Sequence, residues 1–235
     1  MGDRRVVLVT GTSRGIGRSL AERFLASGAA VVGCGRGEPD PPLGDGYVHH
    51  RLDVADEHAV KTLFRDLRQA HGRLDVLVNN AGIAGMNHAL LTPIAQVDRI
   101  LRTNVTGAFL FSREAAKLMQ RSGGGRIVNI VTVATPLRLA GEAVYAASKA
   151  AVESLTRVLA HELGPLGITV NAVGPTPIPT ALTAGVPRAK LDALLDRQAI
   201  RREGTFEDVA NVIDFFVSPA RSFVTGQVLY LGGIS

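Results

Sequence analysis

The chain has 235 residues, of which 46% are hydrophobic and 20% charged, and this composition is typical of a globular protein with a sizeable core. Its formal charge is +5, but no basic tract stands out, and only 5% of the residues are aromatic. Proteins that bind nucleic acid need a clustered basic surface or aromatic stacking platforms, so we expect no nucleic-acid partner. No apolar run is long enough to span a bilayer, so no membrane partner is expected either.

Cys34 is the only cysteine, so an intramolecular disulfide is excluded, and we interpret this residue as a small buried apolar side chain. A strand-like segment, Val6–Val9, begins almost at the N-terminus, where a secretory signal would place a longer apolar stretch. A cytoplasmic location is therefore the expectation.

Short runs of β-branched residues alternate with longer helical patterns along the chain. The expected strands are Val6–Val9, Ala30–Val32, Val48–Leu52, Asp75–Val78, Arg126–Val131, Ile168–Val173 and Gln227–Leu231. The expected helices are Ile16–Ser27, Asp56–Ala70, Ile94–Met119, Ala143–Leu163, Ala189–Gln198 and Phe206–Phe216, and Gly33–Gly46 is expected as a loop. This alternation predicts a single α/β domain over residues 1–235, with a Rossmann-like, doubly wound, mostly parallel sheet and helices on both faces. In such sheets the ligand lies beyond the carboxyl ends of the strands.

A glycine-rich loop, Thr10–Gly17, follows the first strand, reads T-G-T-S-R-G-I-G and opens a helix. Glycines allow the backbone to approach a pyrophosphate closely, and the helix N-terminus offers free N–H groups. Three glycines near a helix start also occur in ordinary turns. The loop resembles the T-G-x-x-x-G-(I/L)-G cofactor motif of the short-chain dehydrogenase/reductase family. This resemblance assigns to the cofactor site Gly11, Ser13, Arg14, Gly15, Ile16 and Gly17.

The second expected strand is followed by Gly33–Arg36, which lacks the acid that NAD enzymes use to bind the ribose hydroxyls. An arginine suits the 2′-phosphate of NADP through charge-assisted contacts. Arg14 and Arg36 occupy the two positions where NADP-preferring members of this family carry basic residues. The resemblance therefore implies NADP(H) as the cofactor, and the alternative is that both arginines are solvated surface residues.

Two further segments resemble cofactor contacts of the family. Asp53 resembles the acid that holds the adenine edge, and its alternative role is a helix N-cap together with Asp56. Asn79–Gly82 reads N-N-A-G, which in the family supports the central sheet and lines the cofactor, although Asn and Gly also favour plain turns. The resemblance assigns to the cofactor site Asp53, Val54, Asn80, Ala81 and Gly82.

Tyr145 and Lys149 form a Y-x-x-x-K motif, and this spacing places both side chains on one helix face. A carbonyl that accepts hydride develops negative charge on its oxygen, and a proton donor near that oxygen lowers the barrier. A neighbouring cation lowers the pKa of a phenol from its ordinary value of about 10. The resemblance implies that Tyr145 is the general acid, and that Lys149 lowers its pKa and binds the nicotinamide ribose. Such a motif alone arises by chance in roughly one chain in twenty, so its position after the Arg126–Val131 strand is what makes it informative.

Two more residues match the catalytic set of the family. Thr132 stands where the family generally has Ser; it keeps a hydroxyl, but its methyl group narrows the site, so a restricted substrate range is expected. Its alternative role is a strand threonine, and Thr135 is a second candidate hydroxyl. Asn104 matches the residue that in the family supports a water linking the lysine to solvent. An asparagine inside a helix breaks local propensity, as functional sites often do.

The segment Asn171–Thr180 resembles the family's nicotinamide cradle, with Thr176 in place of the usual glycine. The residues that align there are Pro175, Ile178 and Thr180. The next segment, Ala181–Leu194, corresponds to the family's mobile substrate lid, so a short lid is expected around residues 181–200. Near the C-terminus, Leu231 stands where the family usually has Asp.

We interpret the sequence as an NADPH-dependent reductase of a ketone or a 3-oxoacyl thioester, resembling 3-oxoacyl-(acyl carrier protein) reductases. The alternatives are an NADP-dependent alcohol dehydrogenase and a non-catalytic NADP(H)-binding protein, and the departures at Thr132, Thr176 and Leu231 favour the latter. No metal site is predicted. The expected partners are a free or carrier-bound carbonyl substrate and further copies of the chain. Family members pair helices corresponding to Ile94–Met119 and Ala143–Leu163 in dimers and often form tetramers.

Overall fold

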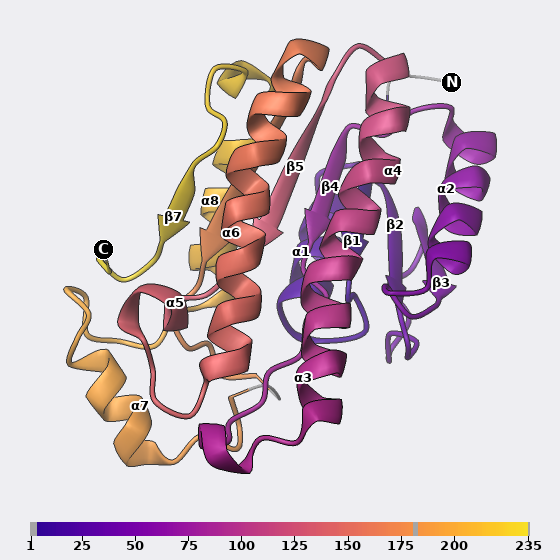
Figure 1. Cartoon of the computed structure of the whole chain (residues 1–235). Helices are drawn as coiled ribbons and strands as arrows, with labels where there is room; N and C mark the ends of the chain where they lie inside the picture. Colours follow the sequence, from indigo (N-terminus) through magenta and orange to yellow (C-terminus); the bar gives the residue numbers. More distant parts are fainter. Residues whose placement is uncertain (1–3, 181–182, 235) are drawn as a thin grey trace.

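The computed structural model describes residues 4–180 and 183–234. Within these residues, seven strands form one parallel sheet in the order β3-β2-β1-β4-β5-β6-β7 (Figure 1). The strands are β1 (Val6–Thr10), β2 (Ala30–Gly35), β3 (Tyr47–Arg51), β4 (Val76–Asn79), β5 (Gly125–Ile130), β6 (Ile168–Gly174) and β7 (Val228–Tyr230). The predicted single-domain, doubly wound α/β fold is confirmed.

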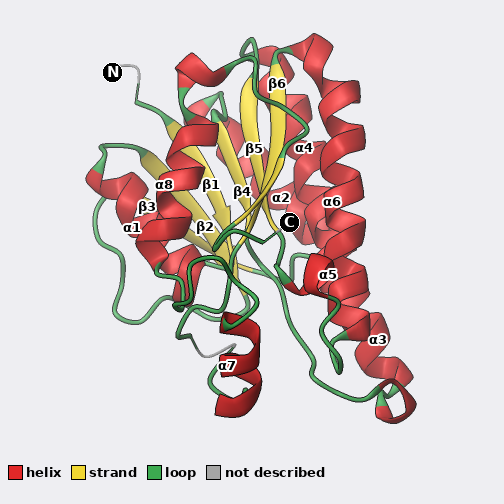
Figure 2. Cartoon of the chain, turned by 90° about the vertical axis from the view of Figure 1, so that its left-hand side faces the viewer, coloured by secondary structure: helices red, strands yellow, loops and turns green. Residues whose placement is uncertain are grey.

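Helices cover both faces of the sheet and also extend beyond its carboxyl edge. They are α1 (Gly15–Ala26), α2 (Glu57–His71), α3 (Ile94–Leu101), α4 (Gly107–Arg121), α5 (Ala134–Leu137), α6 (Ala143–Leu163), α7 (Arg188–Leu195) and α8 (Phe206–Val217). One face carries α1 and α8, and the other carries α2, α4 and α6 (Figure 2). No helix in the described part of the chain is long and apolar enough to cross a membrane.

The sheet separates two apolar cores because alternate side chains of each strand point to opposite faces. In β1, Val7 and Val9 pack with α1 and α8, whereas Leu8 packs with α2 and α4. On the second face the rings of Phe64 and Phe111 meet edge to face, with their centroids 5.7 Å apart. Strands that are buried on both faces read as continuous apolar runs, which is why the sequence indicates them so clearly.

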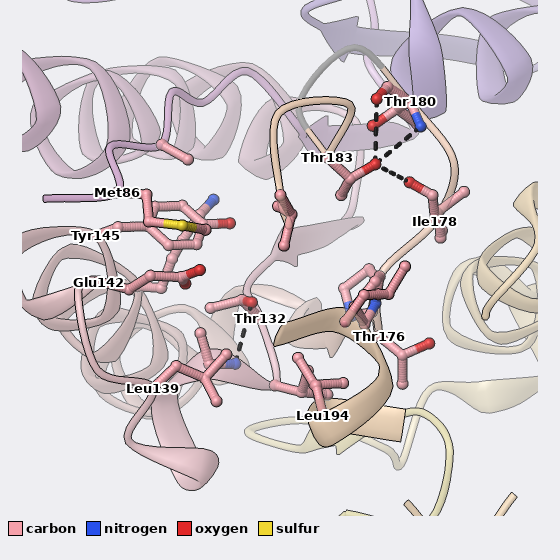
Figure 3. A pocket seen from close by; sticks show the side chains of 18 of the residues that line it. Met86, Thr132, Leu139, Glu142, Tyr145, Thr176, Ile178, Thr180, Thr183 and Leu194 are labelled. Atoms are coloured by element: carbon pink, nitrogen blue, oxygen red, sulfur yellow. Dashed lines mark hydrogen bonds between the residues drawn. The ribbon is translucent and has the colours of Figure 1, made fainter. Parts of the chain in front are cut away.

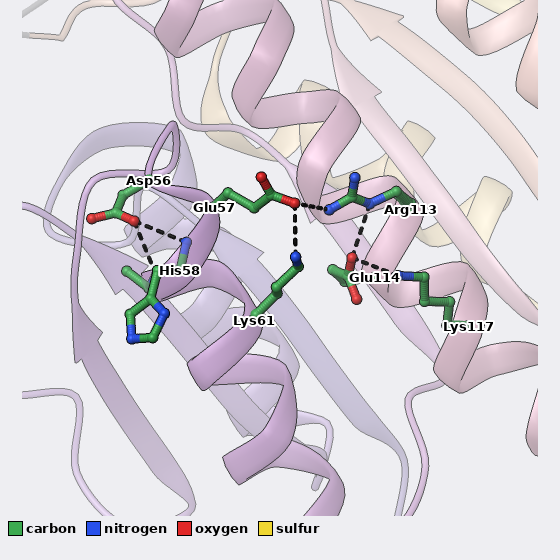
Figure 4. A network of polar contacts seen from close by, with 8 residues as sticks. Asp56, Glu57, His58, Lys61, Arg113, Glu114 and Lys117 are labelled. Carbon is green, nitrogen blue, oxygen red and sulfur yellow. Dashed lines mark hydrogen bonds and ion pairs between the residues drawn. The ribbon is translucent and has the colours of Figure 1, made fainter.

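Caps and ion pairs set the position of α2 against α4. The carboxylate of Asp56 accepts backbone N–H groups of the first turn of α2, and Gly72, with a φ of 71°, ends the helix. On the outer surface, the carboxylate of Glu57 binds Lys61 and Arg113, each at 2.9 Å, and so links the two helices (Figure 4). Exposed ion pairs of this kind contribute little to stability. The hydrogen bonds from the first turn identify Asp56 as the N-cap of α2.

Three local features differ from the sequence prediction. The helix expected over Ile94–Met119 is interrupted by a π-helical turn, Arg102–Thr106, between α3 and α4. The short helix α5 after β5 was not predicted. Strand β2 extends to Gly35, where a loop was expected from Gly33, because pairing with β3 continues through these glycines.

Candidate active site

The loop between β1 and α1 leaves the N-terminus of α1 open to a ligand. Gly11 and Gly15 have positive φ angles of 75° and 60°, which glycine adopts at little cost. A side chain at Gly17 would overlap the carbonyl oxygen of Gly11 and the amide of Asn80, so only glycine allows this close packing. Arg14, at the N-cap of α1, makes no side-chain cap, and the first turn contains no acid. The free N–H groups and the positive end of the helix dipole therefore fit a phosphate group.

Asn80 connects this loop to the end of β4. Its backbone N–H donates to the Thr10 hydroxyl at 3.0 Å, and its Nδ2 donates to the carbonyl oxygens of Thr10 at 2.9 Å and Gly11 at 3.3 Å. The N–H of Ala81 also donates to the Thr10 hydroxyl, at 2.9 Å. These bonds join β1 to β4, so the N-N-A-G segment supports the sheet and is more than a plain turn.

A polar cluster that sequence reasoning missed supports the loop from β3. The hydroxyl of Thr12 lies 2.6 Å from that of Tyr47, which in turn lies 2.7 Å from Nδ1 of His49. Tyr47 reaches the loop across Gly33, where a Cβ would overlap the hydroxyls of Tyr47 and Thr12. Burial raises the pKa of Tyr47 to about 12, so its hydroxyl stays protonated. No motif marks this cluster, and the only signal was a glycine in a strand-like run.

We expect Tyr47→Phe to lower the free energy of unfolding by about 1 kcal/mol and to weaken nicotinamide cofactor binding several-fold, because Thr12 loses its partner. Thermal unfolding and fluorescence titration of the cofactor measure the two effects. Thr12→Val removes the same bond from the other side, so the double variant should lose less than the sum of the single losses. Strictly additive losses would contradict a coupled pair.

Arg14 and Arg36 lie exposed at neighbouring strand ends, one in the loop after β1 and one directly after β2. The carbonyl oxygen of Arg36 accepts a hydrogen bond from Nε of Arg51 at 3.1 Å, which ties the end of β2 to β3. A Cβ at Gly35 would lie 3.9 Å from Oγ of Ser13, so the loop and the end of β2 are adjacent. The two guanidinium groups can therefore serve one site.

Asp53 and Val54 follow β3, and their side chains have different surroundings. One carboxylate oxygen of Asp53 accepts the N–H of Ala55 at 2.9 Å, and the residue is exposed. Asp53 therefore does not cap α2, and a carboxylate oxygen remains available beyond this bond. The side chain of Val54 is buried, and a Cβ at Gly107 of α4 would lie 2.8 Å from it.

A cavity of about 690 Å³ lies beyond the carboxyl ends of β4, β5 and β6 (Figure 3). The predicted site residues that line it are Ile16, Asn80, Gly82, Thr132, Tyr145, Lys149, Pro175, Ile178 and Thr180. The predicted residues outside its lining are Gly11, Ser13, Arg14, Gly15, Gly17, Arg36, Asp53, Val54, Ala81 and Asn104. Within the described ranges, no group of three or more His, Cys, Asp or Glu side chains could hold a metal ion.

Tyr145 and Thr132 face this cavity together (Figure 3). Tyr145 lies in the first turn of α6, and the Thr132 hydroxyl accepts the N–H of Ala134 at 3.2 Å. Burial raises the pKa of Tyr145 to about 12, and the neighbouring Thr132 hydroxyl acts in the opposite direction. Burial is therefore the dominant effect on this pKa, and the expected lowering by Lys149 stays a prediction.

Lys149 is only 5% exposed, and its Nζ donates to the carbonyl oxygen of Ile130 at 2.7 Å. Burial lowers its pKa to about 8, so the ammonium form still predominates at neutral pH. A Cβ at Gly82 would lie 3.3 Å from this Nζ. The ammonium group is therefore held between β5 and the N-N-A-G turn.

Asn104 lies directly behind the lysine, in the π-helical turn Arg102–Thr106. Its Nδ2 donates to the carbonyl oxygen of Ile83 and to the hydroxyl of Ser148, both at 2.9 Å, and its Oδ1 accepts the N–H of Ile83 at 2.9 Å. π-Helical turns occur frequently at functional sites. The widened turn lets one buried amide connect the segment after β4 to the residue preceding Lys149.

Known proteins of one family match almost the whole chain. A family model described as enoyl-(acyl carrier protein) reductase matches residues 11–234. A short-chain type dehydrogenase/reductase of Picea abies is 38% identical, and the alignment covers 97% of this chain and 91% of that protein. The chain belongs to the short-chain dehydrogenase/reductase family.

Members of the short-chain dehydrogenase/reductase family are oxidoreductases that use nicotinamide cofactors. The 3-oxoacyl-(acyl-carrier-protein) reductase FabG of Vibrio cholerae is 33% identical, with 97% of this chain and 96% of that protein covered. The structure of an aldohexose dehydrogenase of Thermoplasma acidophilum superposes with a TM-score of 0.88 at 32% identity, covering 98% of this chain and 94% of that one.

Two departures from the usual short-chain dehydrogenase/reductase pattern are accommodated by packing. Thr176 is buried, and a Cβ at Gly204 or at Gly232 would lie 2.8 Å from its side chain, so two glycines make room for it. The side chain of Leu231 packs against the core on the α1 and α8 face, and its N–H donates to the carbonyl oxygen of Gly174 at 2.9 Å. Thr176 lines the cavity that Tyr145 faces, whereas Leu231 lies outside its lining.

Proposed function

We propose that this chain is an NADPH-dependent carbonyl reductase, which converts a ketone or a 3-oxoacyl thioester to the hydroxy compound. The observation that carries the proposal is the meeting of the protonated phenol of Tyr145, the hydroxyl of Thr132 and the ammonium group of Lys149 at one cavity. The similarity to a 3-oxoacyl-(acyl-carrier-protein) reductase supports the thioester as one substrate class.

Each of these groups has a distinct role in the proposed reaction. Tyr145 donates its proton to the carbonyl oxygen of the substrate. The Thr132 hydroxyl accepts a bond from Ala134 and is also hydrogen-bonded to Tyr145, so in the proposed reaction its hydrogen turns from the phenol to the same carbonyl oxygen. The Lys149 ammonium group stabilises the negative charge that remains on the phenol oxygen. NADPH, when bound, supplies the hydride that reaches the carbonyl carbon.

The proposed cofactor site continues along the carboxyl edge of the sheet. We assign the pyrophosphate to the α1 N-terminus and the nicotinamide to Pro175, Ile178 and Thr180. Arg14 and Arg36 bind the 2′-phosphate in this proposal. The acid nearest to this site in sequence, Glu38, has its carboxylate 3.8 Å from Nε2 of His49. The family's usual NAD-type acid is thus missing from the end of β2, and this supports NADPH over NADH.

The two alternative functions differ from this proposal in the proton they require. Reduction uses the phenol form of Tyr145 as an acid, and oxidation of an alcohol uses its phenolate form as a base. A pKa of about 12 makes the phenol the predominant form at neutral pH, as a proton donor requires. A non-catalytic NADP(H)-binding protein would need no such proton donor, so the convergence of three catalytic groups at the cavity supports an enzyme instead.

Consumption of NADPH by the purified protein, followed over a panel of ketones and 3-oxoacyl thioesters, tests the proposal. We expect turnover of at least one substrate, and a slower NADP-dependent oxidation of the matching alcohol at neutral pH. Tight binding of NADPH with no turnover across the panel would favour the non-catalytic alternative. Faster oxidation than reduction under equal cofactor concentrations would favour the alcohol dehydrogenase.

We expect Thr132→Ser to raise kcat/KM for the bulkiest ketones by about tenfold, because loss of one methyl group widens the cavity beside Tyr145. Small ketones should change little, since the hydroxyl is retained. Thr135→Ser is the matched control: the Thr135 side chain lies outside the cavity lining, so the variant should leave the substrate range unchanged. A uniform loss of activity in Thr132→Ser would contradict a steric role for the methyl group.

Three further assignments stay proposals. We propose residues 181–200 as a substrate lid: residues 181–182 lie outside the described residues, and α7 extends beyond the carboxyl edge of the sheet (Figure 1). We propose a homo-oligomer, dimer or tetramer, that pairs α4 and α6, where Phe109 is 40% and Val158 50% exposed; sedimentation velocity measures its size. We also propose a cytoplasmic location, which cell fractionation tests.

A further inference from the structure

Glu142 places a carboxylate in the cavity beside the proposed proton donor. It precedes Tyr145 by one helical turn and is the N-cap residue of α6. An acid at this position normally accepts backbone N–H groups of the first turn and is stabilised by the helix dipole. The Glu142 side chain makes no such cap. It lines the cavity, on the same side as Tyr145 (Figure 3).

The surroundings of this carboxylate are mostly apolar. The cavity wall on this side includes Leu139 and Met86 (Figure 3). Burial accordingly raises the pKa of Glu142, and the ammonium group of Lys190 opposes this rise. Among residues 4–180 and 183–234, no residue forms a hydrogen bond or an ion pair with the Glu142 carboxylate. The Glu142 side chain is half-buried, so water that enters the cavity can reach the carboxylate, and a bound molecule that displaces this water must supply the hydrogen bond in its place.

Charge around Glu142 restricts which donor fits. Lys149 lines the same cavity, and Nζ of Lys190 lies close enough that a Cβ at Gly141 would be 4.0 Å from it. A positively charged group on the substrate would be repelled by the ammonium groups of Lys149 and Lys190. A neutral hydroxyl meets no such repulsion and donates one hydrogen bond to a charged acceptor, the stronger kind of hydrogen bond.

We propose that Glu142 is a specificity-determining residue that accepts a hydrogen bond from a substrate hydroxyl close to the reacting carbonyl. The enzyme therefore prefers hydroxyketones to ketones of the same shape that lack the hydroxyl. This inference rests on the proposed carbonyl reductase function and narrows its substrate class. Sites built to bind a hydroxyl discriminate strongly against analogues without one, because the buried acceptor is then left unpaired.

The test compares two substrates of equal size, octan-3-one and 1-hydroxyheptan-2-one, in which a hydroxyl replaces a methyl group. The quantity measured is the ratio of kcat/KM for the hydroxyketone to that for the ketone, with NADPH. Comparing this ratio between proteins cancels the intrinsic reactivity of the two carbonyls. We expect Glu142→Met, which keeps the length and removes the acceptor, to lower the ratio by about tenfold or more. Glu142→Gln, which keeps one acceptor oxygen and removes the charge, should lower it less.

Glu162→Gln is the matched control, since this acid is exposed on the same helix and should leave the ratio at the wild-type value. Thermal unfolding of each variant verifies that it is folded, and Glu142→Gln supplies a second measurement if Glu142→Met is unstable. An unchanged ratio in folded Glu142 variants would overturn the inference alone. Failure of the wild-type protein to reduce either ketone or any member of the wider panel would instead overturn the carbonyl reductase function on which it rests.

Discussion

Replacing Tyr145 with phenylalanine is expected to lower kcat by about three orders of magnitude and to leave NADPH binding nearly unchanged. The substitution removes one hydroxyl and keeps the ring that packs at the start of α6. At a pKa of about 12 this hydroxyl is protonated at neutral pH, so its loss removes the proton donor itself. The Thr132 hydroxyl and the Lys149 ammonium group remain, and they account for the residual rate. Steady-state NADPH oxidation gives kcat, and fluorescence titration gives the dissociation constant of NADPH.

Tyr230→Phe is the matched control for this experiment. Tyr230 belongs to β7 and lies outside the cavity lining, and its ring packs against Gly174. The control therefore removes a phenol hydroxyl without touching the proposed proton donor, and we expect turnover close to that of the wild type. If Tyr145→Phe retained more than about a tenth of the wild-type kcat, Tyr145 would not be the general acid.

Arg36→Ala is expected to raise the KM for NADPH by about ten- to a hundredfold and the KM for NADH by no more than about twofold. A hydrogen bond to a charged group contributes about 1.5–3 kcal/mol, and only NADPH carries the 2′-phosphate that accepts one from this guanidinium group. The exposed position of Arg36 at the end of β2 leaves its side chain free to reach a ligand. The difference between the two cofactors should shrink as salt concentration rises, because ions screen exposed charges.

Arg65→Ala controls for a general loss of positive charge, since Arg65 is exposed on α2 and pairs with Asp66 at 3.1 Å. We expect this variant to leave both KM values unchanged. Combining Arg36→Ala with Arg14→Ala should reduce the preference for NADPH further than either change alone. Equal increases for NADPH and NADH in Arg36→Ala would mean that Arg36 is a surface charge with no part in cofactor selection.

Features that depend only on residues close together in the sequence were predictable from the sequence. Continuous apolar runs such as Val6–Val9 predicted strands buried on both faces, and all seven expected strands are present among the described residues. The glycines of Thr10–Gly17 predicted an open helix N-terminus, because the conformations they allow are a local property. The i and i+4 spacing of Tyr145 and Lys149 likewise sets their shared helix face without reference to the rest of the fold.

The sequence pattern was ambiguous where a segment is compatible with two local structures. Helical periodicity runs through Ile94–Met119, but five residues of this segment form the π-helical turn that contains Asn104. Whether these residues form a regular α-helix or a π-helical turn depends on the hydrogen bonds of Asn104 to Ile83 and Ser148, which lie in other parts of the fold. Asp53 and Asp56 were both candidates for the N-cap of α2, and the hydrogen bonds give this role to Asp56, because the Asp53 carboxylate accepts from Ala55 before the helix begins.

By itself, the sequence determined the fold class, the glycine-rich loop with its open helix N-terminus and the Tyr145–Lys149 pair, since each follows from short-range geometry. Only the tertiary structure decided that Tyr47 supports Thr12 across Gly33, and that the Glu142 carboxylate turns away from its own helix and into the cavity. It also decided that burial raises the pKa of Tyr145. Burial and side-chain contacts depend on elements brought together from distant parts of the chain, and no local pattern records which of those elements will surround a given group.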